Sequence, residues 1–134
     1  MEYFKPDGIF REIYTEGADG VPQYKVYAGG WVEGEEFYDV RTPIDGSVIA
    51  RVPKVRWDLV DRALDLLKSR GRWSIRDTPG WKRVELLNRV ADVMEKHRDV
   101  FVEALIVNTG KTRSQALGEF NSSVDRLRRA ELDA

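Results

Sequence analysis

Side chains able to do chemistry are scarce in this sequence, which has 134 residues, no cysteine and a single histidine, His97. Without cysteine, these residues can form no disulfide, no thiolate metal site and no cysteine nucleophile. One histidine excludes a zinc site built on a histidine pair and leaves only His97 as the base of a serine triad. Lys96 and Arg98 flank this histidine, which favours a solvated position near the end of a helix over a catalytic one.

A second candidate is the segment Gly110-Lys111-Thr112, which resembles the end of a phosphate-binding loop. That signature requires a glycine five residues before the Gly-Lys pair, so that bare backbone amides can surround the phosphates. Leu105 stands at that position, inside an apolar run that suits a helix better than a strand. The segment is therefore interpreted as a turn that ends a helix.

Carboxylate pairs such as Glu35-Glu36 are a third candidate, because buried neighbouring carboxyls can do acid–base work. With 23 acidic residues in the chain, such pairs are also expected by chance. Four tryptophans could stack on a ligand, but side chains of this type more often lie at the margin of a core. They are Trp31, Trp57, Trp73 and Trp81.

Overall charge argues against nucleic acid and membrane partners. The 22 basic and 23 acidic residues leave a formal charge of -1, so no net field attracts phosphate backbones or anionic lipid. Arginines cluster near the C-terminus at Arg126, Arg128 and Arg129, but acidic residues interleave with them and predict ion pairs on a solvated helix. No apolar run approaches the length of a bilayer span. We expect a cytoplasmic protein with neither kind of partner.

The first half of the chain predicts strands joined by tight turns. A Gly-Gly turn and an Asp-Gly turn each lie between segments of strand-forming residues, which is typical of hairpins. The predicted strand segments are Tyr24–Ala28 with Trp31–Val32, and Glu36–Arg41 with Ser47–Val52, the last closed by Pro53.

From Arg56 onward the apolar residues recur at helical spacing. The predicted helices run from Arg56 to a glycine stop at Gly71, from a Thr78-Pro79 start to about Arg98, over Val100–Asn108, and over Arg113–Leu132. Their expected buried stripes are Val60, Ala63, Leu64 and Leu67 in the first helix, Val84, Leu87, Ala91 and Met94 in the second, and Ala116, Phe120, Val124 and Leu127 in the fourth. The fold class is therefore mixed α/β, with strand hairpins followed by about four helices.

Six short motifs, in order and at matching spacing, resemble the start of an aldehyde dehydrogenase. They are Tyr27–Val32, Val40–Pro53, Asp61–Leu64, Trp73, the Arg83…Leu87…Ala91-Asp92 series, and Thr109–Lys111 with Ala116 and Glu119. The resemblance implies a partial fold without the family's Rossmann-type sheet. Residues 1–55 would be an N-terminal arm and residues 56–134 the helical flank of the cofactor domain, together one incomplete domain.

Family chemistry explains what this resemblance implies for activity. In the family a cysteine thiolate attacks the aldehyde, hydride passes to NAD or NADP, and a glutamate-activated water hydrolyses the thioester. The cysteine, the glutamate and the cofactor segment lie further along such chains than Ala134. We therefore expect no catalytic or cofactor-binding residue here, no cofactor bound by this chain alone, and no activity by itself.

The resemblance also offers weak site candidates on the helix after Gly-Lys, which in the family partly lines the aldehyde entrance. On this chain that helix presents Glu119, Ser122, Ser123 and Arg126. The alternative is an ordinary solvated helix face, and the sequence leaves both open.

A structural cation is the remaining site that the resemblance implies. Its ligands would be the carbonyls of Val40 and Arg41 together with residue 108, where some members carry aspartate. This chain has Asn108 instead, a departure that puts the cation in doubt.

A finer pattern, Gly71-Arg-Trp-Ser with Asp125-Arg-Leu-Arg, is similar to archaeal non-phosphorylating glyceraldehyde-3-phosphate dehydrogenases. The charge-rich composition would suit a thermophilic source. The expected partner is the remaining C-terminal part of the enzyme, or further copies in an oligomer. A stand-alone module that pairs with intact dehydrogenase subunits is the alternative.

Overall fold

The computed structural model describes residues 5–130, which divide by their contacts into two compact units, one ending at Trp73 and one beginning at Ser74. The predicted division into residues 1–55 and 56–134 refers to the complete enzyme and stays a prediction.

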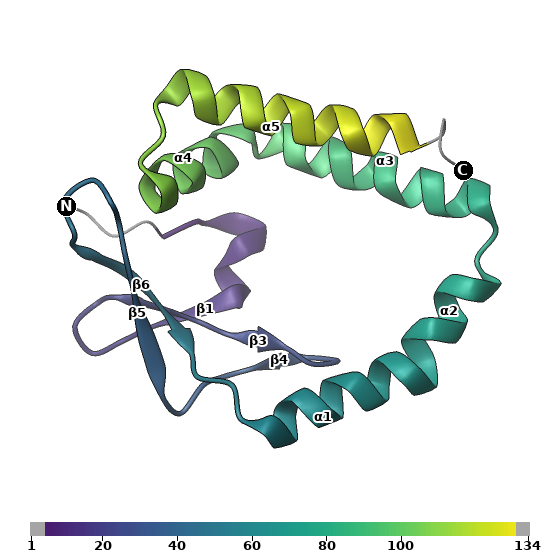
Figure 1. Ribbon diagram of the computed structural model, residues 1–134, viewed down its shortest axis with the longest axis horizontal. Helices are drawn as coiled ribbons and strands as arrows, with labels where there is room; N and C mark the ends of the chain where they lie inside the picture. The colour runs from purple at the N-terminus through teal and green to yellow at the C-terminus, as the bar shows by residue number, and fades with distance from the viewer. Residues whose placement is uncertain (1–4, 131–134) are drawn as a thin grey trace. The chain divides into compact units, whose positions relative to one another are not determined.

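Short strands and three helical segments build the described part of the first unit (Figure 1). Its elements are the 3-10 helix η1 (Gly8–Ile13), strands β1 (Tyr14–Glu16), β2 (Pro22–Tyr24), β3 (Val26–Tyr27), β4 (Trp31–Val32), β5 (Phe37–Arg41) and β6 (Val48–Pro53), helix α1 (Trp57–Leu66) and the π-helical turn η2 (Leu67–Gly71). Helix α2 (Arg72–Asp77) follows directly. Four strands form a sheet in the order β1-β2-β6-β5, with β2 and β6 parallel, while β3 and β4 pair separately.

Both predicted hairpins are confirmed. In the first, Val26 lies opposite Val32, and Gly29 takes the positive φ of 77° that the turn requires. In the second, β5 and β6 are antiparallel, with Asp39 opposite Arg51. The continuous strand expected over Tyr24–Ala28 is wrong, because the chain leaves the four-stranded sheet after β2 and enters the β3–β4 pair.

Two predictions about the first helix are wrong. Gly71 does not end it, because this glycine lacks the positive φ of a helix stop and the backbone passes through η2 directly into α2. The packed face also differs in part from the expected one, since Val60 and Ala63 are half-buried as predicted but Leu64 and Leu67 are exposed. Leu59 and Leu66 face the β3–β4 hairpin, where Leu59 lines a groove and Leu66 lies against Gly29, while Leu67 is largely exposed.

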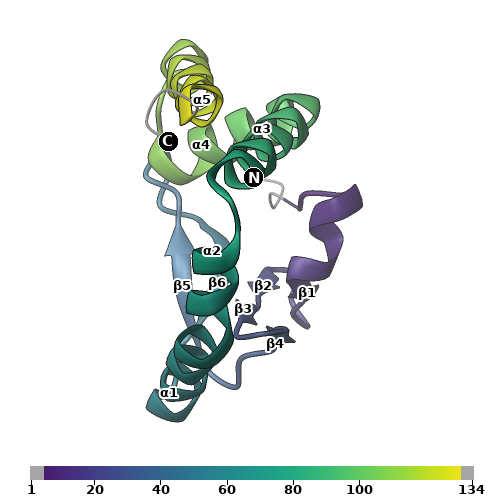
Figure 2. The ribbon, with the colours of Figure 1, turned by 90° about the vertical axis from the view of Figure 1, so that its right-hand side faces the viewer.

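Three helices form the second unit: α3 (Gly80–Lys96), α4 (Arg98–Thr109) and α5 (Arg113–Arg128). Helix α5 packs against both α3 and α4 (Figure 2). The buried core combines one residue of α3, one of α4 and three of α5: Ala91, Val102, Ala116, Phe120 and Val124. The mixed α/β order of strands first and helices second is thus confirmed, with five α-helices rather than about four among residues 5–130.

Local chemistry sets the helix ends of this unit. Thr78 does not cap α3 as expected; Pro79 holds the cap position, and the Thr78 hydroxyl donates instead to the Ser74 carbonyl at 2.6 Å. Ser74 lies one turn earlier, in α2, and its carbonyl takes the hydrogen bond of the Thr78 hydroxyl, which is then not used to cap α3. The stop at Gly110 is confirmed: its φ is 70° and its N–H donates to the Ile106 carbonyl at 2.8 Å.

Candidate functional site

The segment Gly110-Lys111-Thr112 has a structural role in each of its residues. Gly110 ends α4 in the left-handed conformation. Lys111 forms an ion pair with Glu119. Thr112 caps α5: its Oγ1 accepts from the Gln115 N–H at 3.3 Å, and the Gln115 Oε1 accepts from the Thr112 N–H at 3.1 Å. This capping box, which the Thr-x-x-Gln spacing could have indicated, supports the interpretation as a turn between helices.

The four predicted entrance residues come together on one face of α5. Glu119, Ser122, Ser123 and Arg126 are all exposed, at spacings that place them on one face beside the buried Ala116–Val124 side of the helix. Glu119 pairs with Lys111, and the Ser123 hydroxyl donates to the Glu119 carbonyl at 2.9 Å. The face is polar and open, and its role at an aldehyde entrance stays a prediction.

Arg126 and Arg128 both lie on α5 but differ in their ion pairs. Arg128 reaches across to α3, where its guanidinium lies 2.7 Å from an Asp92 carboxylate oxygen and 2.5 Å from one of Glu95. Arg126 makes no hydrogen bond or ion pair within residues 5–130. The prediction was of pairs with acidic residues interleaved on the same helix, whereas Arg128 pairs with two acidic residues of α3. Arg126 is exposed, and its charge is open to an anion.

Donors of the predicted cation lie in different units. Val40 and Arg41 end β5 at an irregularity in its pairing with β6, and Asn108 lies in the last turn of α4. Two carbonyls and one amide oxygen are ligands that suit a hard cation. Within residues 5–130, no group of three or more His, Asp or Glu side chains could hold a metal. That finding concerns side-chain clusters and does not test a site made of two backbone carbonyls and an amide. The cation therefore stays a prediction.

His97 joins α3 to α4 and is half-buried at that junction. The backbone N–H of His97 donates to the Val93 and Met94 carbonyls, both at 3.1 Å. The expected position near a helix end is confirmed, although the side chain is less solvated than expected.

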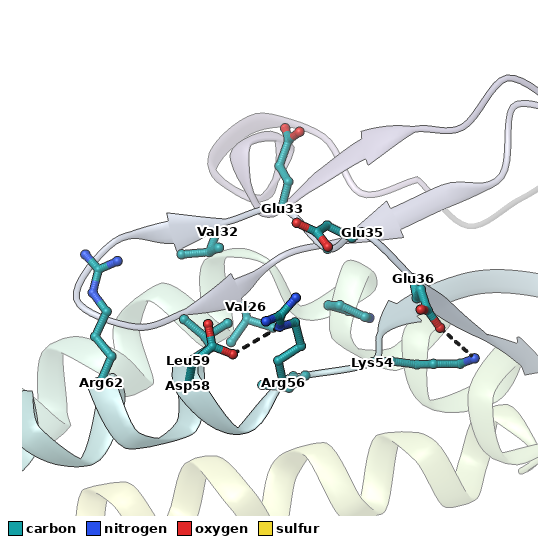
Figure 3. Close-up of a pocket in the computed structure, with 13 residues that line it drawn as sticks. Val26, Val32, Glu33, Glu35, Glu36, Lys54, Arg56, Asp58, Leu59 and Arg62 are labelled. Atoms are coloured by element: carbon teal, nitrogen blue, oxygen red, sulfur yellow. Dashed lines mark hydrogen bonds and ion pairs between the residues drawn. The ribbon is translucent and has the colours of Figure 1, made fainter.

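A groove of about 600 Å³ lies between the β3–β4 hairpin, the end of β6 and the start of α1 (Figure 3). Val26, Val32 and Leu59 supply apolar surface. The charged side chains around it include two ion pairs, Lys54 with Glu36 at 3.2 Å and Arg56 with Asp58 at 3.1 Å. Its lining contains no histidine, serine or threonine, so it offers no hydroxyl nucleophile. The predicted carboxylate pair Glu35-Glu36 does line the groove, but both residues are exposed, whereas acid–base work by a pair calls for burial.

The passage from β6 to α1 through Lys54, Val55 and Arg56 does not fit a dinucleotide. It runs from a strand into a helix, as a phosphate-binding turn does, but it has no glycine to admit a pyrophosphate. Asp58 adds a negative charge in the first turn of the helix. The glycine pair at Gly29 belongs to a hairpin instead.

Large apolar side chains are exposed on several helices. On α1, Trp57 is 82% exposed and Leu64 is also exposed, and exposed Leu67 follows in η2. The expectation that tryptophans sit at a core margin is wrong for Trp57 and for Trp81, which is 65% exposed. On α3, exposed apolar side chains recur at Leu86, Val90 and Val93. Within residues 5–130, no helix is long and apolar enough to cross a membrane.

Comparison with known proteins gives one consistent family. Residues 31–132 match the model of the aldehyde dehydrogenase family. The 2-aminomuconic 6-semialdehyde dehydrogenase of Pseudomonas sp is 34% identical over 123 residues, which are 84% of this chain and 25% of that protein. The D-glyceraldehyde dehydrogenase (NADP(+)) of Thermoplasma acidophilum is 27% identical over 106 residues, 77% of this chain and 21% of that one.

Solved structures agree with the sequence matches. An NAD-dependent benzaldehyde dehydrogenase from Corynebacterium glutamicum has a TM-score of 0.68 at 31% identity, covering 78% of this chain and 23% of that chain. Aldehyde dehydrogenase 21 from Physcomitrella patens, solved with the reaction product succinate, has a TM-score of 0.75 at 22% identity. The similarity covers 81% of this chain and 23% of that chain. The latter similarity shows the fold alone. The chain spans about a quarter of the length of these relatives.

Proposed function

This chain belongs to the aldehyde dehydrogenase family, and on that premise we propose that it is the N-terminal structural part of an NAD(P)-dependent aldehyde dehydrogenase and is inactive by itself. The complete enzyme oxidises an aldehyde to an acid. This chain supplies the strand hairpins and the helical bundle, and the catalytic thiol and the cofactor site come from a C-terminal part. The protein is cytoplasmic.

One observation carries the proposal: the family match covers residues 31–132, yet the chain has no cysteine and spans about a quarter of its relatives. Family chemistry needs a thiolate nucleophile. The turn between β6 and α1 lacks the glycines that a dinucleotide requires. Neither the attack on the aldehyde nor the hydride transfer to NAD(P) has its residues in this chain. We therefore propose that the chain contributes structure to the enzyme.

The test has two steps. First, the purified chain is assayed with simple aldehydes and glyceraldehyde-3-phosphate, using NAD and NADP. We expect no turnover above background, and turnover would refute the inactivity. Second, the chain replaces the matched N-terminal segment of the Pseudomonas relative, either fused or added as a separate chain. Restored aldehyde oxidation is expected, and a folded but inactive fusion would count against a dehydrogenase role.

A finer assignment is a non-phosphorylating glyceraldehyde-3-phosphate dehydrogenase, a thermophilic and oligomeric enzyme using NADP or NAD. It is supported by the Gly71–Ser74 and Asp125–Arg128 patterns and by the similarity to a D-glyceraldehyde dehydrogenase. Arg126, which has no ion pair within residues 5–130, offers a positive charge to a phosphorylated aldehyde from the open face of α5. The test compares turnover of phosphorylated and unphosphorylated aldehydes by the fusion.

A second candidate is a stand-alone module that pairs with intact dehydrogenase subunits, or with itself. The exposed apolar side chains on α1 and α3 favour it, since such surface is normally covered by a partner. Size-exclusion chromatography with light scattering separates the two candidates. A chain that stays monomeric and does not co-elute with the intact relative would count against the module.

A further inference from the structure

Most of the charged side chains that line the groove at the start of α1 have a partner of opposite charge. These ion pairs are Lys54 with Glu36 at 3.2 Å, Arg56 with Asp58 at 3.1 Å, and Glu33 with Lys25 at 3.7 Å. The other charged residues of the lining are Glu35 and Arg62, which are exposed and make no ion pair within residues 5–130. The groove therefore leaves one negative and one positive charge for a ligand to match.

Glu35 and Arg62 belong to different walls of the groove (Figure 3). Glu35 lies on the segment between β4 and β5, whereas Arg62 lies on α1. In the view of Figure 3, Arg62 extends toward the β3–β4 hairpin, and Val32 lies between it and Glu35. Val26 and Leu59 add further apolar surface to the lining. Water alone satisfies a single exposed charge, but here two opposite charges share a groove that also has apolar surface.

The wall that carries Glu35 is anchored on both sides of this residue. Gly34 lies so close to Pro53 that an added Cβ would come within 2.5 Å of the proline Cβ. On the other side, the Lys54 N–H donates to the Glu36 carbonyl at 2.8 Å. The backbone at Glu35 is therefore held at the end of β6, and its carboxylate has a defined place on the wall.

Helix α1 supplies the other wall. Arg62 follows Leu59 by three residues, so the two side chains share one side of the helix. The same helix contacts the hairpin further along, where an added Cβ at Gly29 would lie 2.7 Å from the Leu66 Cδ1. The guanidinium and the apolar Leu59 thus approach the groove from one rigid element.

We propose that this groove binds a small zwitterion, an apolar chain with an ammonium group at one end and a carboxylate at the other. The ammonium group pairs with Glu35, and the carboxylate accepts hydrogen bonds from the Arg62 guanidinium. The chain between them covers apolar surface of the lining. A ligand with one charge would leave either Glu35 or Arg62 without a match. The volume of about 600 Å³ suits a small molecule.

The first test compares three probes that differ only in charge. 6-Aminohexanoate carries both groups, hexanoate only the carboxylate, and hexylamine only the ammonium group. Each is titrated at constant ionic strength into the isotope-labelled chain, and NMR follows the backbone amides. We expect saturable shifts at Glu35, Leu59 and Arg62 with 6-aminohexanoate. An exposed ion pair contributes modestly, so the dissociation constants of the two singly charged probes should be about fivefold larger.

Two further amino acids, 4-aminobutanoate and 8-aminooctanoate, allow for the unequal spans that ligands of this class can bridge. Absence of saturable shifts in the groove with all three amino acids overturns the proposal. Equal affinity for 6-aminohexanoate and for either singly charged probe also overturns it, because one charge would then be enough.

Charge reversal supplies the second test. Glu35→Lys and Arg62→Glu should each weaken the binding of 6-aminohexanoate about fivefold or more. The double variant should regain the affinity of the original chain, because an ω-amino acid can bind with its two ends exchanged. The matched controls are Glu103→Lys and Arg89→Glu, at exposed residues outside the groove that make no ion pair within residues 5–130. They should leave binding unchanged.

A folded double variant that does not regain binding overturns the proposal, and so does an equal loss in the control variants. The melting temperature shows whether each variant folds, and the probe series on the unsubstituted chain decides the matter if one does not. Binding is measured without aldehyde oxidation, so its failure leaves the proposed function intact.

Discussion

Arg51 and Asp19, separated by 32 residues in sequence, meet end on: the two terminal nitrogens of the guanidinium donate hydrogen bonds of 2.9 and 2.7 Å to the two carboxylate oxygens. The pair ties the turn between β1 and β2 to β6, and Arg51 also donates to Asp39 on β5 at 3.2 Å. One arginine thus connects three segments of the first unit.

Acid should weaken this connection. The hydrogen bond from Arg51 lowers the pKa of Asp19 from 3.8 to about 2. Because the pKa is lower in the folded state, the stabilisation is complete above pH 3.8 and is lost as the pH falls towards 2. Asp19→Asn should therefore lower the melting temperature at pH 7, with a difference that shrinks through this window. Asp61→Asn, at an exposed carboxylate without an ion pair in residues 5–130, is the control. A constant difference down to pH 2 would contradict the assignment.

Gly29→Ala should destabilise the first unit, whereas Gly30→Ala should not. An added Cβ at Gly29 would lie 2.7 Å from the Leu66 Cδ1, on a backbone with φ +77°. At Gly30 a Cβ meets nothing within 4 Å. We expect a loss of about 1–2 kcal/mol for the first variant and a change within about 0.5 kcal/mol for the second, measured by urea unfolding. Equal effects would show that α1 does not pack on the hairpin as described.

Gly118→Ala should stabilise the second unit. Gly118 is inside α5, is exposed, and leaves open space where a Cβ would be. Alanine reduces the conformational entropy of the unfolded chain, and the expected gain is about 0.5–1 kcal/mol in urea unfolding. A loss of stability in the isolated chain would mean that another segment lies against this position.

Arg128→Met should lower the melting temperature of the second unit more than Arg126→Met. Arg128 joins α5 to Asp92 and Glu95 of α3, while Arg126 on the same helix has no ion pair within residues 5–130. Salt screens exposed charges, so the difference between the two variants should shrink in 1 M NaCl, where the screening length is about 3 Å. A drop of equal size for both arginines would contradict the interhelical role.

The same Arg126 provides a test of the entrance residues, conditional on an active fusion. If α5 borders the aldehyde entrance, Arg126→Gln should raise KM for glyceraldehyde-3-phosphate about tenfold, by removing a charge-assisted contact with the phosphate. KM for an unphosphorylated aldehyde should not change. Equal effects on both substrates would reject a phosphate contact, and no effect on either would leave α5 as an ordinary solvated helix.

Local signals predicted most of the fold. The Gly-Gly and Asp-Gly turns lie where the two hairpins turn, and Gly110 ends α4, because each depends on backbone conformations set within a few residues. The helical period of α5 also accounts for the shared face of Glu119, Ser122 and Arg126, while their role at an aldehyde entrance stays a prediction. Local reasoning was wrong at Gly71, where the chain stays helical, and at Thr78, whose hydroxyl turns back to α2.

The sequence by itself determined the family, the order of strands and helices, and the lack of a thiol nucleophile, since these follow from composition, spacing and turn chemistry. Tertiary structure alone decided part of the packed face of the first helix, where Leu66 packs against Gly29 and Leu67, expected to be buried, is largely exposed. In α3 and α5 the expected stripes are the ones that pack inward, with Ala91 and Phe120 in the core. Helical periodicity identifies apolar rows but does not rank them, because the choice depends on neighbours distant in sequence. The pairing of Arg51 with Asp19 depends on the fold for the same reason.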